Sequence, residues 1–413
     1  MRLAITKACP SRLPTVRYTS PVSASRVAVT QSSSSTLAKR WTELQGCNNW
    51  EGLLDPLDDS LRAEILRYGK FAQSAYDAFE FDVSSDSYAT SRYRKQELLL
   101  HSGMPDSGYV PTRNLHATSG IQLPRWVDRA PSWMSIQSSW IGYVAVADDP
   151  KTISRLGRRD IVIAYRGTVT CLEWLENLRS MLTQLPGSSA SGCLPMVESG
   201  FWSLFTSRSL KRLSLCEAVR DEVRRLLKRY KDEPISITVT GHSLGAALAV
   251  LTAYDITMTF RHKSPPVTVY SFAGPRVGNE SFRRHMERQG SKVLRIVNSQ
   301  DVITKVPGIV LDDEEESPER CQTKSHLPVE LLKSLLDTRW DYVDVGQELR
   351  LSTLDCPDLS RHAGNVAKCH DLDMYLNLVS GYSSSTCPFK VAAKAELSTL
   401  RRKSSDRKTS LLI

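Results

Sequence analysis

The chain lacks any long hydrophobic run. Across its 413 residues, no apolar stretch approaches the roughly 18 residues that a membrane-spanning helix needs. The longest candidate, around residues 246–251, is soon followed by polar residues. With 41% hydrophobic and 24% charged residues, the composition is that of an ordinary globular chain. Any contact with a membrane is therefore expected to be peripheral.

Metal-ligand and disulfide patterns are also missing. The nine cysteines include no C-x-x-C pair and no zinc-type spacing, so the sequence indicates neither a disulfide framework nor a metal site. No internal repeat is visible. We expect no cofactor and no metal, and the sequence does not specify an oligomeric state.

The first forty residues contain no acidic residue. They carry seven basic residues among many serines and threonines, without the apolar core of a secretory signal, which is typical of an organelle transit peptide. Residues 390–413 hold seven basic residues against two acidic ones, and we expect a disordered basic tail there. Because these ends carry the excess behind the net charge of +9, the charge gives little support to nucleic-acid binding. Residues 41–389 remain as the folded domain.

A candidate nucleophile lies in the pentapeptide of residues 241–245, which reads G-H-S-L-G. A β-branched strand, residues 235–240, precedes it, and an alanine-rich helix follows. In this setting G-x-S-x-G predicts a nucleophile elbow, a strained turn that exposes a serine at the end of an α/β sheet. The other glycine pair at this spacing, Gly274 and Gly278, has an arginine at its centre. We therefore select Ser243.

Ser243 needs a histidine as general base and an acid that orients it, which follow in the order serine, acid, histidine in α/β-hydrolases. Asp301 comes just after an expected strand at residues 292–298, where catalytic groups of open α/β sheets collect. His370 directly precedes an expected helix at residues 371–379. His362 is the reserve candidate, and we expect His326 to be an ordinary surface residue or a satisfied core group.

Two backbone N–H groups are candidates for the oxyanion hole, which stabilises the charged tetrahedral intermediate. Leu244 follows the nucleophile, so the elbow itself places its N–H group. The second donor must come from an earlier strand-to-helix loop. The apolar run at residues 161–165 ends in Arg-Gly-Thr, which selects Thr168.

Strands and helices alternate through the rest of the chain. Residues 55–79 predict a helix with an apolar stripe, and residues 210–230 predict another that buries positions from Leu213 to Leu227. Residues 267–272 predict the strand after the nucleophile helix. This alternation indicates an α/β fold with a mostly parallel central sheet and helices on both faces.

Five motifs occur in the order found in one family. The chain resembles the class 3 lipases, which have the α/β-hydrolase fold, and more closely the plastid-targeted class I sn-1 phospholipases A of plants. The segments that carry the resemblance to class 3 lipases are residues 165–168, 240–246, 271–279, 298–307 and 369–372. Residues 142–146 and 55–79 carry the closer one.

The resemblance implies an acyl hydrolase that cleaves the sn-1 ester of phosphatidylcholine, often of galactolipids, and weakly of triacylglycerol. It implies Ser243, Asp301 and His370 as the triad, with Thr168 and Leu244 as oxyanion donors. It also implies a chloroplast location, which composition alone does not separate from a mitochondrial one.

Two further expectations concern lipid contact and rival functions. Residues 168–182 have apolar positions at helical spacing, so they predict either a lid helix beside the oxyanion loop or a core helix. A lid would make the membrane or a lipid droplet the surface that the protein contacts. The alternative functions are a neutral-lipid lipase or acyltransferase on the same triad, or a catalytically silent lipid-binding protein.

Overall fold

The fold is that of a computed structural model, which describes residues 32–118, 138–168, 181–186, 194–209, 212–307, 342–356, 359–382 and 384. Within these residues the core is a seven-stranded sheet with the order β1-β2-β3-β6-β7-β8-β9. Its strands are β1 (Tyr109–Thr118), β2 (Ser138–Ala147), β3 (Arg159–Tyr165), β6 (Ile235–His242), β7 (Val267–Phe272), β8 (Lys292–Asn298) and β9 (Gln347–Leu351). A separate antiparallel pair is formed by β4 (Leu182–Gln184) and β5 (Met196–Glu198).

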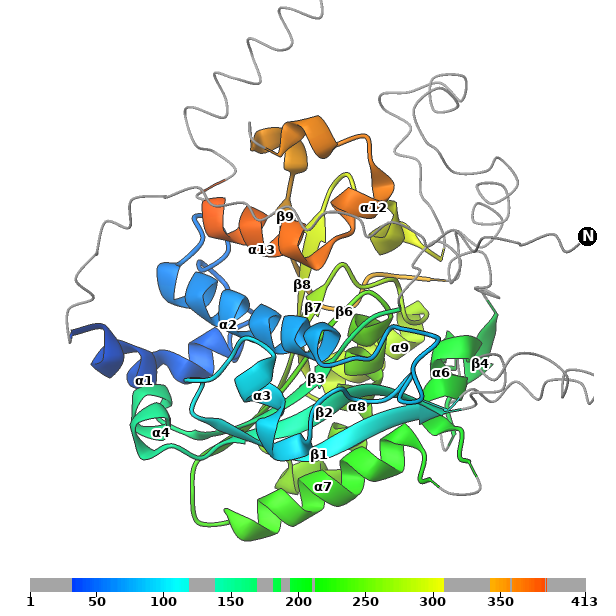
Figure 1. The fold of residues 1–413 in the computed structure, drawn as a ribbon. Coiled ribbons are helices and arrows are strands. Elements are labelled where there is room, and N and C mark those ends of the chain that lie inside the picture. Colours follow the sequence, from blue (N-terminus) through cyan, green and yellow to red (C-terminus); the bar gives the residue numbers. More distant parts are fainter. Residues whose placement is uncertain are drawn as a thin grey trace, which may run out of the picture.

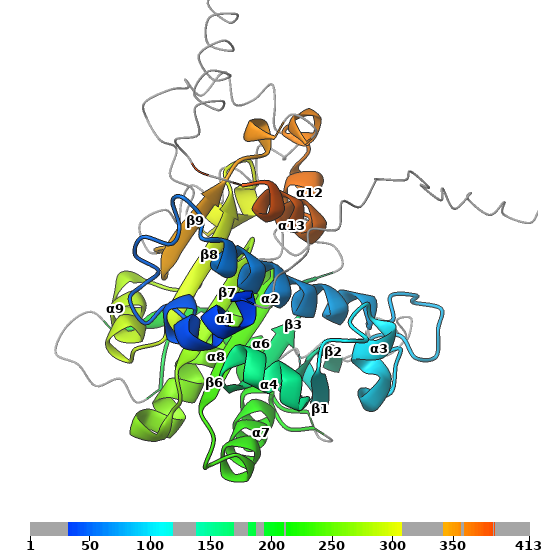
Figure 2. The same cartoon turned by 90° about the vertical axis from the view of Figure 1, so that its left-hand side faces the viewer.

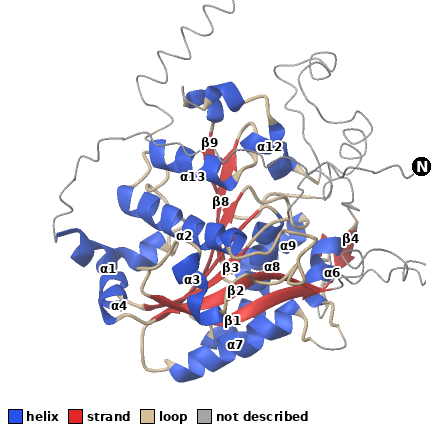
Figure 3. Cartoon of the chain, in the orientation of Figure 1, coloured by secondary structure: helices blue, strands red, loops and turns tan. Residues whose placement is uncertain are grey.

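The sheet is antiparallel at one edge and parallel elsewhere. Strand β2 pairs antiparallel with both β1 and β3, whereas β3, β6, β7, β8 and β9 pair parallel in that order. Figure 3 shows the strands between helices on either side. The predicted α/β-hydrolase architecture, a mostly parallel sheet covered on both faces, is confirmed.

Helices cover the two faces in two groups, each packed on its own buried apolar cluster. One face carries α1 (Ser32–Leu44), α2 (Asp59–Asp77), α3 (Leu98–His101), α4 (Pro150–Leu156) and α13 (Leu372–Gly381). The other carries α6 (Ser199–Thr206), α7 (Leu215–Arg229), α8 (Leu244–Phe260) and α9 (Glu280–Arg288). The short elements are η1 (Lys95–Glu97), η3 (Arg261–Lys263), η4 (Val302–Lys305), η5 (Thr353–Asp355), η6 (Ser360–His362) and α12 (Val366–Cys369).

Helices α2 and α13 lie side by side although they come from opposite ends of the chain (Figures 1 and 2). Arg62 of α2 donates hydrogen bonds to the carbonyl oxygens of Val379 and Tyr382, at the end of α13. Since the last carbonyls of a helix have no partner within the helix, this arginine ties α13 to α2.

The nucleophile helix α8 is apolar on all sides and buried from Leu244 to Thr257, as a helix in the centre of a domain must be. Helix α7 begins later than the sequence suggested. Ser214 and Glu217 form a capping box that starts the helix at Leu215, so Leu213 lies outside it and is exposed. The expectation that Leu213 is buried is wrong.

Helix α1 spans residue 40, after which we expected the transit peptide to end and the folded domain to begin. The carbonyl oxygen of Ala38 lies only 2.6 Å from where a Cβ on Gly157 would stand, so α1 packs directly on the end of α4. Arg40 pairs with Glu43 and with Asp58, the N-cap of α2. The helix thus packs on the folded domain at Ala38, within the segment expected to be a disordered transit peptide, and the end of that peptide stays a prediction. Residues 385–413 lie outside the described residues.

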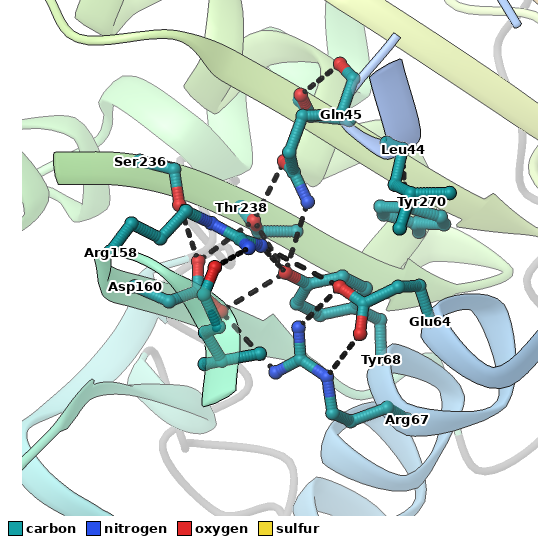
Figure 4. Close-up of polar contacts among 12 residues, drawn as sticks. Leu44, Gln45, Glu64, Arg67, Tyr68, Arg158, Asp160, Ser236, Thr238 and Tyr270 are labelled. Atoms are coloured by element: carbon teal, nitrogen blue, oxygen red, sulfur yellow. Dashed lines mark hydrogen bonds and ion pairs between the residues drawn. The ribbon is translucent and has the colours of Figure 1, made fainter. Parts of the chain in front are cut away.

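A buried polar network joins α2 and the end of α1 to the start of the parallel strands (Figure 4). Asp160, fully buried, accepts hydrogen bonds from Tyr109 at 2.7 Å and Ser236 at 2.8 Å. Burial opposes its ionisation, but Arg158 and Arg67 outweigh this and lower the pKa of Asp160. The network is completed by Gln45, Glu64, Tyr68 and Thr238.

This network predicts that losing a carboxylate inside it destabilises the protein more than losing one outside it. Asp160→Ala should lower the free energy of unfolding by about 3–5 kcal/mol, because it leaves buried arginines short of a counter-charge. Glu233→Ala, which removes the partly exposed partner of Arg159, should cost less than about 1 kcal/mol. Urea unfolding measures both values, and equal losses would contradict the account.

Candidate active site

Ser243 lies on a sharp turn between β6 and α8. Its φ of 58° and ψ of −125° are unusual for a residue with a side chain, and such a conformation costs about 1–3 kcal/mol. The turn is held by its backbone, because the N–H of Ser243 donates to the carbonyl oxygen of Phe272 at 3.0 Å. The structure therefore has the backbone geometry of a nucleophile elbow.

The two glycines of the motif are required by close approach. A Cβ on Gly241 would stand 2.8 Å from the backbone nitrogen of Ala246, and a Cβ on Gly245 would stand 2.5 Å from the carbonyl oxygen of Arg166. Both distances are too short for any side chain. The strand, the turn and the start of α8 thus pack against each other and against the end of β3.

The loop after β3 lies against the elbow. A Cβ on Gly167 would stand 2.8 Å from the carbonyl oxygen of His242 and 3.0 Å from Cβ of Ser243, which places Thr168 one residue beyond this contact. Leu244 is the first residue of α8, where backbone N–H groups have no acceptor within the helix. The two candidate oxyanion donors thus lie on two segments that meet at the elbow: Leu244 directly follows Ser243, and Thr168 follows the glycine that contacts it.

Asp301 and His370 are hydrogen-bonded. Nδ1 of His370 lies 2.8 Å from Oδ2 of Asp301, and both side chains are buried. A carboxylate only accepts, so Nδ1 carries the proton and Nε2 is the nitrogen that can take another. Oδ1 of Asp301 accepts from the N–H of Ile303 at 3.0 Å, which fixes the carboxylate after β8.

His370 is joined to the elbow through His242. Nε2 of His242 lies 2.7 Å from the carbonyl oxygen of His370, and Nδ1 lies 2.7 Å from the hydroxyl of Tyr76. Since a carbonyl only accepts, Nε2 of His242 is the donor and Nδ1 accepts from Tyr76. Burial and the neighbouring His370 lower the pKa of His242 well below its usual value, which keeps this ring neutral.

Oδ2 of Asp301 has a second donor besides His370. The hydroxyl of Tyr375 in α13 donates to Oδ2 of Asp301 at 2.7 Å and accepts from the N–H of Asn298 at 3.1 Å. Burial and the charge of Asp301 raise the pKa of Tyr375 well above its usual value, so the hydroxyl stays protonated. The side chain of Asn298 also holds the carbonyl oxygen of Cys369 at 3.0 Å, which anchors the histidine loop to β8.

The structure thus brings the candidates to the carboxyl ends of β3, β6 and β8, from positions far apart in the sequence. Sequence reasoning missed three residues of the site. His242 was only a spacer in the G-x-S-x-G motif, Tyr375 was only an apolar position of an expected helix, and Tyr76 was only one residue within the expected helix at 55–79. The reserve candidate His362 lies in η6, where its ring accepts from Arg361. His326 and residues 169–180 of the expected lid lie outside the described residues.

The arrangement can perform nucleophilic acyl transfer, which needs a serine, a base and an orienting acid. In the described part of the chain, no three histidine, cysteine or carboxylate side chains form a cluster that could hold a metal ion. No helix among those residues is long and apolar enough to cross a bilayer.

Comparisons with known proteins identify related lipases and phospholipases. The family model "Lipase (class 3)" matches residues 162–311. A protein of Arabidopsis thaliana named phospholipase A(1) DAD1, chloroplastic, is 58% identical over 367 residues, which cover 87% of this chain and 80% of the relative. Galactolipase DONGLE, chloroplastic, from the same organism is 41% identical over 360 residues, covering 83% and 70%.

Among solved structures, the native complex of the Rhizomucor miehei lipase with its propeptide aligns with a TM-score of 0.44 at 16% identity. The alignment covers 79% of this chain and 82% of that one.

The contact between His242 and His370 predicts a kinetic effect. His242→Phe removes the donor to the His370 carbonyl, and a small displacement of a catalytic group costs about 10- to 100-fold in rate. We expect a loss of that size in kcat on a soluble nitrophenyl ester. His362→Gln is the control and should leave kcat unchanged. A His242→Phe protein with the wild-type kcat would show that the contact has no role in catalysis.

Proposed function

We propose that this chain, which belongs to the phospholipase A1 group of the class 3 lipase family and is a carboxylic ester hydrolase, cleaves the sn-1 ester of membrane glycerolipids. Ser243, His370 and Asp301 would perform the reaction. The observation that carries the proposal is the hydrogen bond of 2.8 Å between His370 and Asp301. The pair is joined to the elbow through His242, the residue before a serine on a positive-φ turn. The family relationship supports a glycerolipid ester as the substrate, and the arrangement of the site supports nucleophilic cleavage of that ester.

In the proposed acylation step, Oγ of Ser243 attacks the ester carbonyl carbon as its proton passes to Nε2 of His370. Asp301 stabilises the imidazolium that forms. The carbonyl oxygen becomes an oxyanion, which accepts hydrogen bonds from the N–H groups of Leu244 and Thr168. When the tetrahedral intermediate collapses, the bond to the lysolipid oxygen breaks and His370 returns the proton to that oxygen.

Deacylation repeats the step with water. The water molecule gives its proton to Nε2 of His370 and attacks the acyl-enzyme carbonyl carbon. Collapse releases the free fatty acid, and the proton returns from His370 to Oγ of Ser243. The net reaction consumes one ester bond and one water molecule, so no cofactor or metal is needed.

The names of the relatives support the substrates and the location that we propose. Phospholipase A1 and galactolipase activities are named for proteins 58% and 41% identical, which supports phosphatidylcholine and galactolipids as substrates. Several relatives are named chloroplastic, which supports a plastid location. We propose that a transit peptide ends before α1 rather than near residue 40, because α1 packs on α4.

Lipid substrates imply contact with a lipid surface. We propose that the protein binds the face of a membrane or lipid droplet peripherally while one lipid enters the site. Large apolar side chains exposed on the described part of the molecule include Phe81, Val83 and Met181. Met181 belongs to residues 168–182, the segment expected to form a lid, and is the first described residue of that segment after Thr168.

The first prediction of the proposed function concerns Ser243→Ala. This variant should lower kcat on the order of 10⁶-fold, about 8 kcal/mol in the barrier, as for other serine acyl hydrolases. A fluorophosphonate probe should label the wild type and not the variant. Ser271→Ala, which changes a buried serine on the adjacent strand, should keep both activity and labelling. A Ser243→Ala protein that hydrolyses lipid at the wild-type rate would refute the assignment.

The second prediction concerns the bond that is cut. Phosphatidylcholine with different acyl chains at sn-1 and sn-2 should release the sn-1 fatty acid and leave a 2-acyl lysolipid, resolved by mass spectrometry. Galactolipid should be cleaved too, and triacylglycerol slowly. Preference for triacylglycerol would favour a neutral-lipid lipase, and transfer to an alcohol an acyltransferase. A folded protein that neither labels nor turns over would favour a silent lipid-binding protein.

A further inference from the structure

Two arginines flank strand β3, one directly before it and one directly after it. Arg158 and Arg166 are both buried. Arg158 lies in the polar network, 3.5 Å from the carboxylate of Glu64. Arg166, on the oxyanion loop, forms no ion pair with any described residue, and burial lowers its pKa to about 10. It therefore remains positively charged at neutral pH.

Backbone and hydroxyl oxygens take the place of a carboxylate around Arg166. Nε donates to the carbonyl oxygen of Trp140 at 3.0 Å, Nη2 donates to the hydroxyl of Ser139 at 3.0 Å, and Nη1 donates to the carbonyl oxygen of Gly167 at 2.6 Å. The guanidinium carbon also lies 3.6 Å from the ring centre of Phe79, a cation–π contact. The guanidinium plane is thus fixed on all sides.

The contact with Gly167 reaches the oxyanion loop through a single peptide group. A peptide group is planar, and in its trans form the C=O and N–H bonds point in opposite directions. The N–H across the plane from the Gly167 carbonyl belongs to Thr168. Holding that oxygen at Arg166 therefore sets the direction of the Thr168 N–H.

The same contact polarises the peptide. A hydrogen bond from a charged donor is stronger than one between neutral groups, and hydrogen bonds in series strengthen one another in a medium of low dielectric constant. Electron density drawn toward the Gly167 oxygen leaves the Thr168 N–H a better donor. A Cβ on Gly167 would stand 3.0 Å from Cβ of Ser243, so the effect acts next to the proposed nucleophile.

We propose that Arg166 is a positioning residue for the oxyanion hole, whose fork holds the Gly167–Thr168 peptide so that the Thr168 N–H faces the developing negative charge. The inference rests on the proposed function, because it needs an oxyanion at Ser243. It assigns the effect to the directed hydrogen bonds of the guanidinium, so a lysine in its place, which keeps the charge but has no planar fork, is insufficient.

The test compares Arg166→Lys with Arg158→Lys. The control is matched because Arg158 also donates from Nε, Nη1 and Nη2, to Ser236, the carbonyl oxygen of Leu156 and Tyr68, at the far end of the same strand. Full-length protein is assayed on a soluble nitrophenyl ester. The final stoichiometry of fluorophosphonate labelling counts competent sites, so that kcat is expressed per folded molecule.

An oxyanion-hole donor contributes about 10²- to 10³-fold in kcat, and a misdirected one loses part of this. We expect Arg166→Lys to lower kcat by roughly 10- to 100-fold with little change in KM. Binding of a trifluoromethyl ketone, whose hemiketal oxygen imitates the oxyanion, should weaken in parallel with kcat/KM. Arg158→Lys should lower the thermal midpoint and leave kcat per competent site and ketone binding unchanged.

Three outcomes would overturn the inference. They are a wild-type kcat in Arg166→Lys, a loss that appears in KM alone, or an equal loss of kcat in Arg158→Lys. Failure of the proposed function is recognised separately, because Ser243→Ala would then remain active and the probe would label another residue. An inactive Ser243→Ala protein beside a fully active Arg166→Lys protein removes only the role of Arg166.

Discussion

The close crossing of β6, the turn at Ser243 and α8 is the constraint on which the site depends. A strained turn persists only where its surroundings hold it. Here β6 is hydrogen-bonded to parallel strands on both sides, and α8 is buried through most of its length. Neither element can relax without exposing the core, so Gly241 and Gly245 and the backbone after β3 are forced into contact. The serine and the oxyanion loop meet for this reason.

A chain of hydrogen bonds extends the elbow across the molecule. It runs from Tyr76 of α2 through His242 to the backbone of His370, then from the ring of His370 through Asp301 to Tyr375 of α13. Helices α2 and α13 are themselves packed together. His370, the proposed base, is therefore held from both α2 and α13, so the early helix α2 helps to build the proposed site.

The sequence was most informative where chemistry is local. Three features can be recognised in the sequence alone: the G-x-S-x-G motif, the position of Asp301 after a strand and the order of the motifs. The predicted sheet is confirmed. Contacts that form only on folding carry none. The ring of His242 reaches His370 across 128 positions, and Arg166 reaches the backbone of β2, so no spacing marks them. Helix α1 was not predicted, because charge composition does not register its packing on Gly157.

A crystal structure of the protein inhibited by a lipid-like phosphonate tests the central claim most directly. The account predicts a covalent bond from phosphorus to Oγ of Ser243, the phosphoryl oxygen within hydrogen-bond distance of the backbone nitrogens of Leu244 and Thr168, and Nε2 of His370 facing the leaving-group side. An adduct on another residue, or a phosphoryl oxygen turned away from both nitrogens, would contradict it.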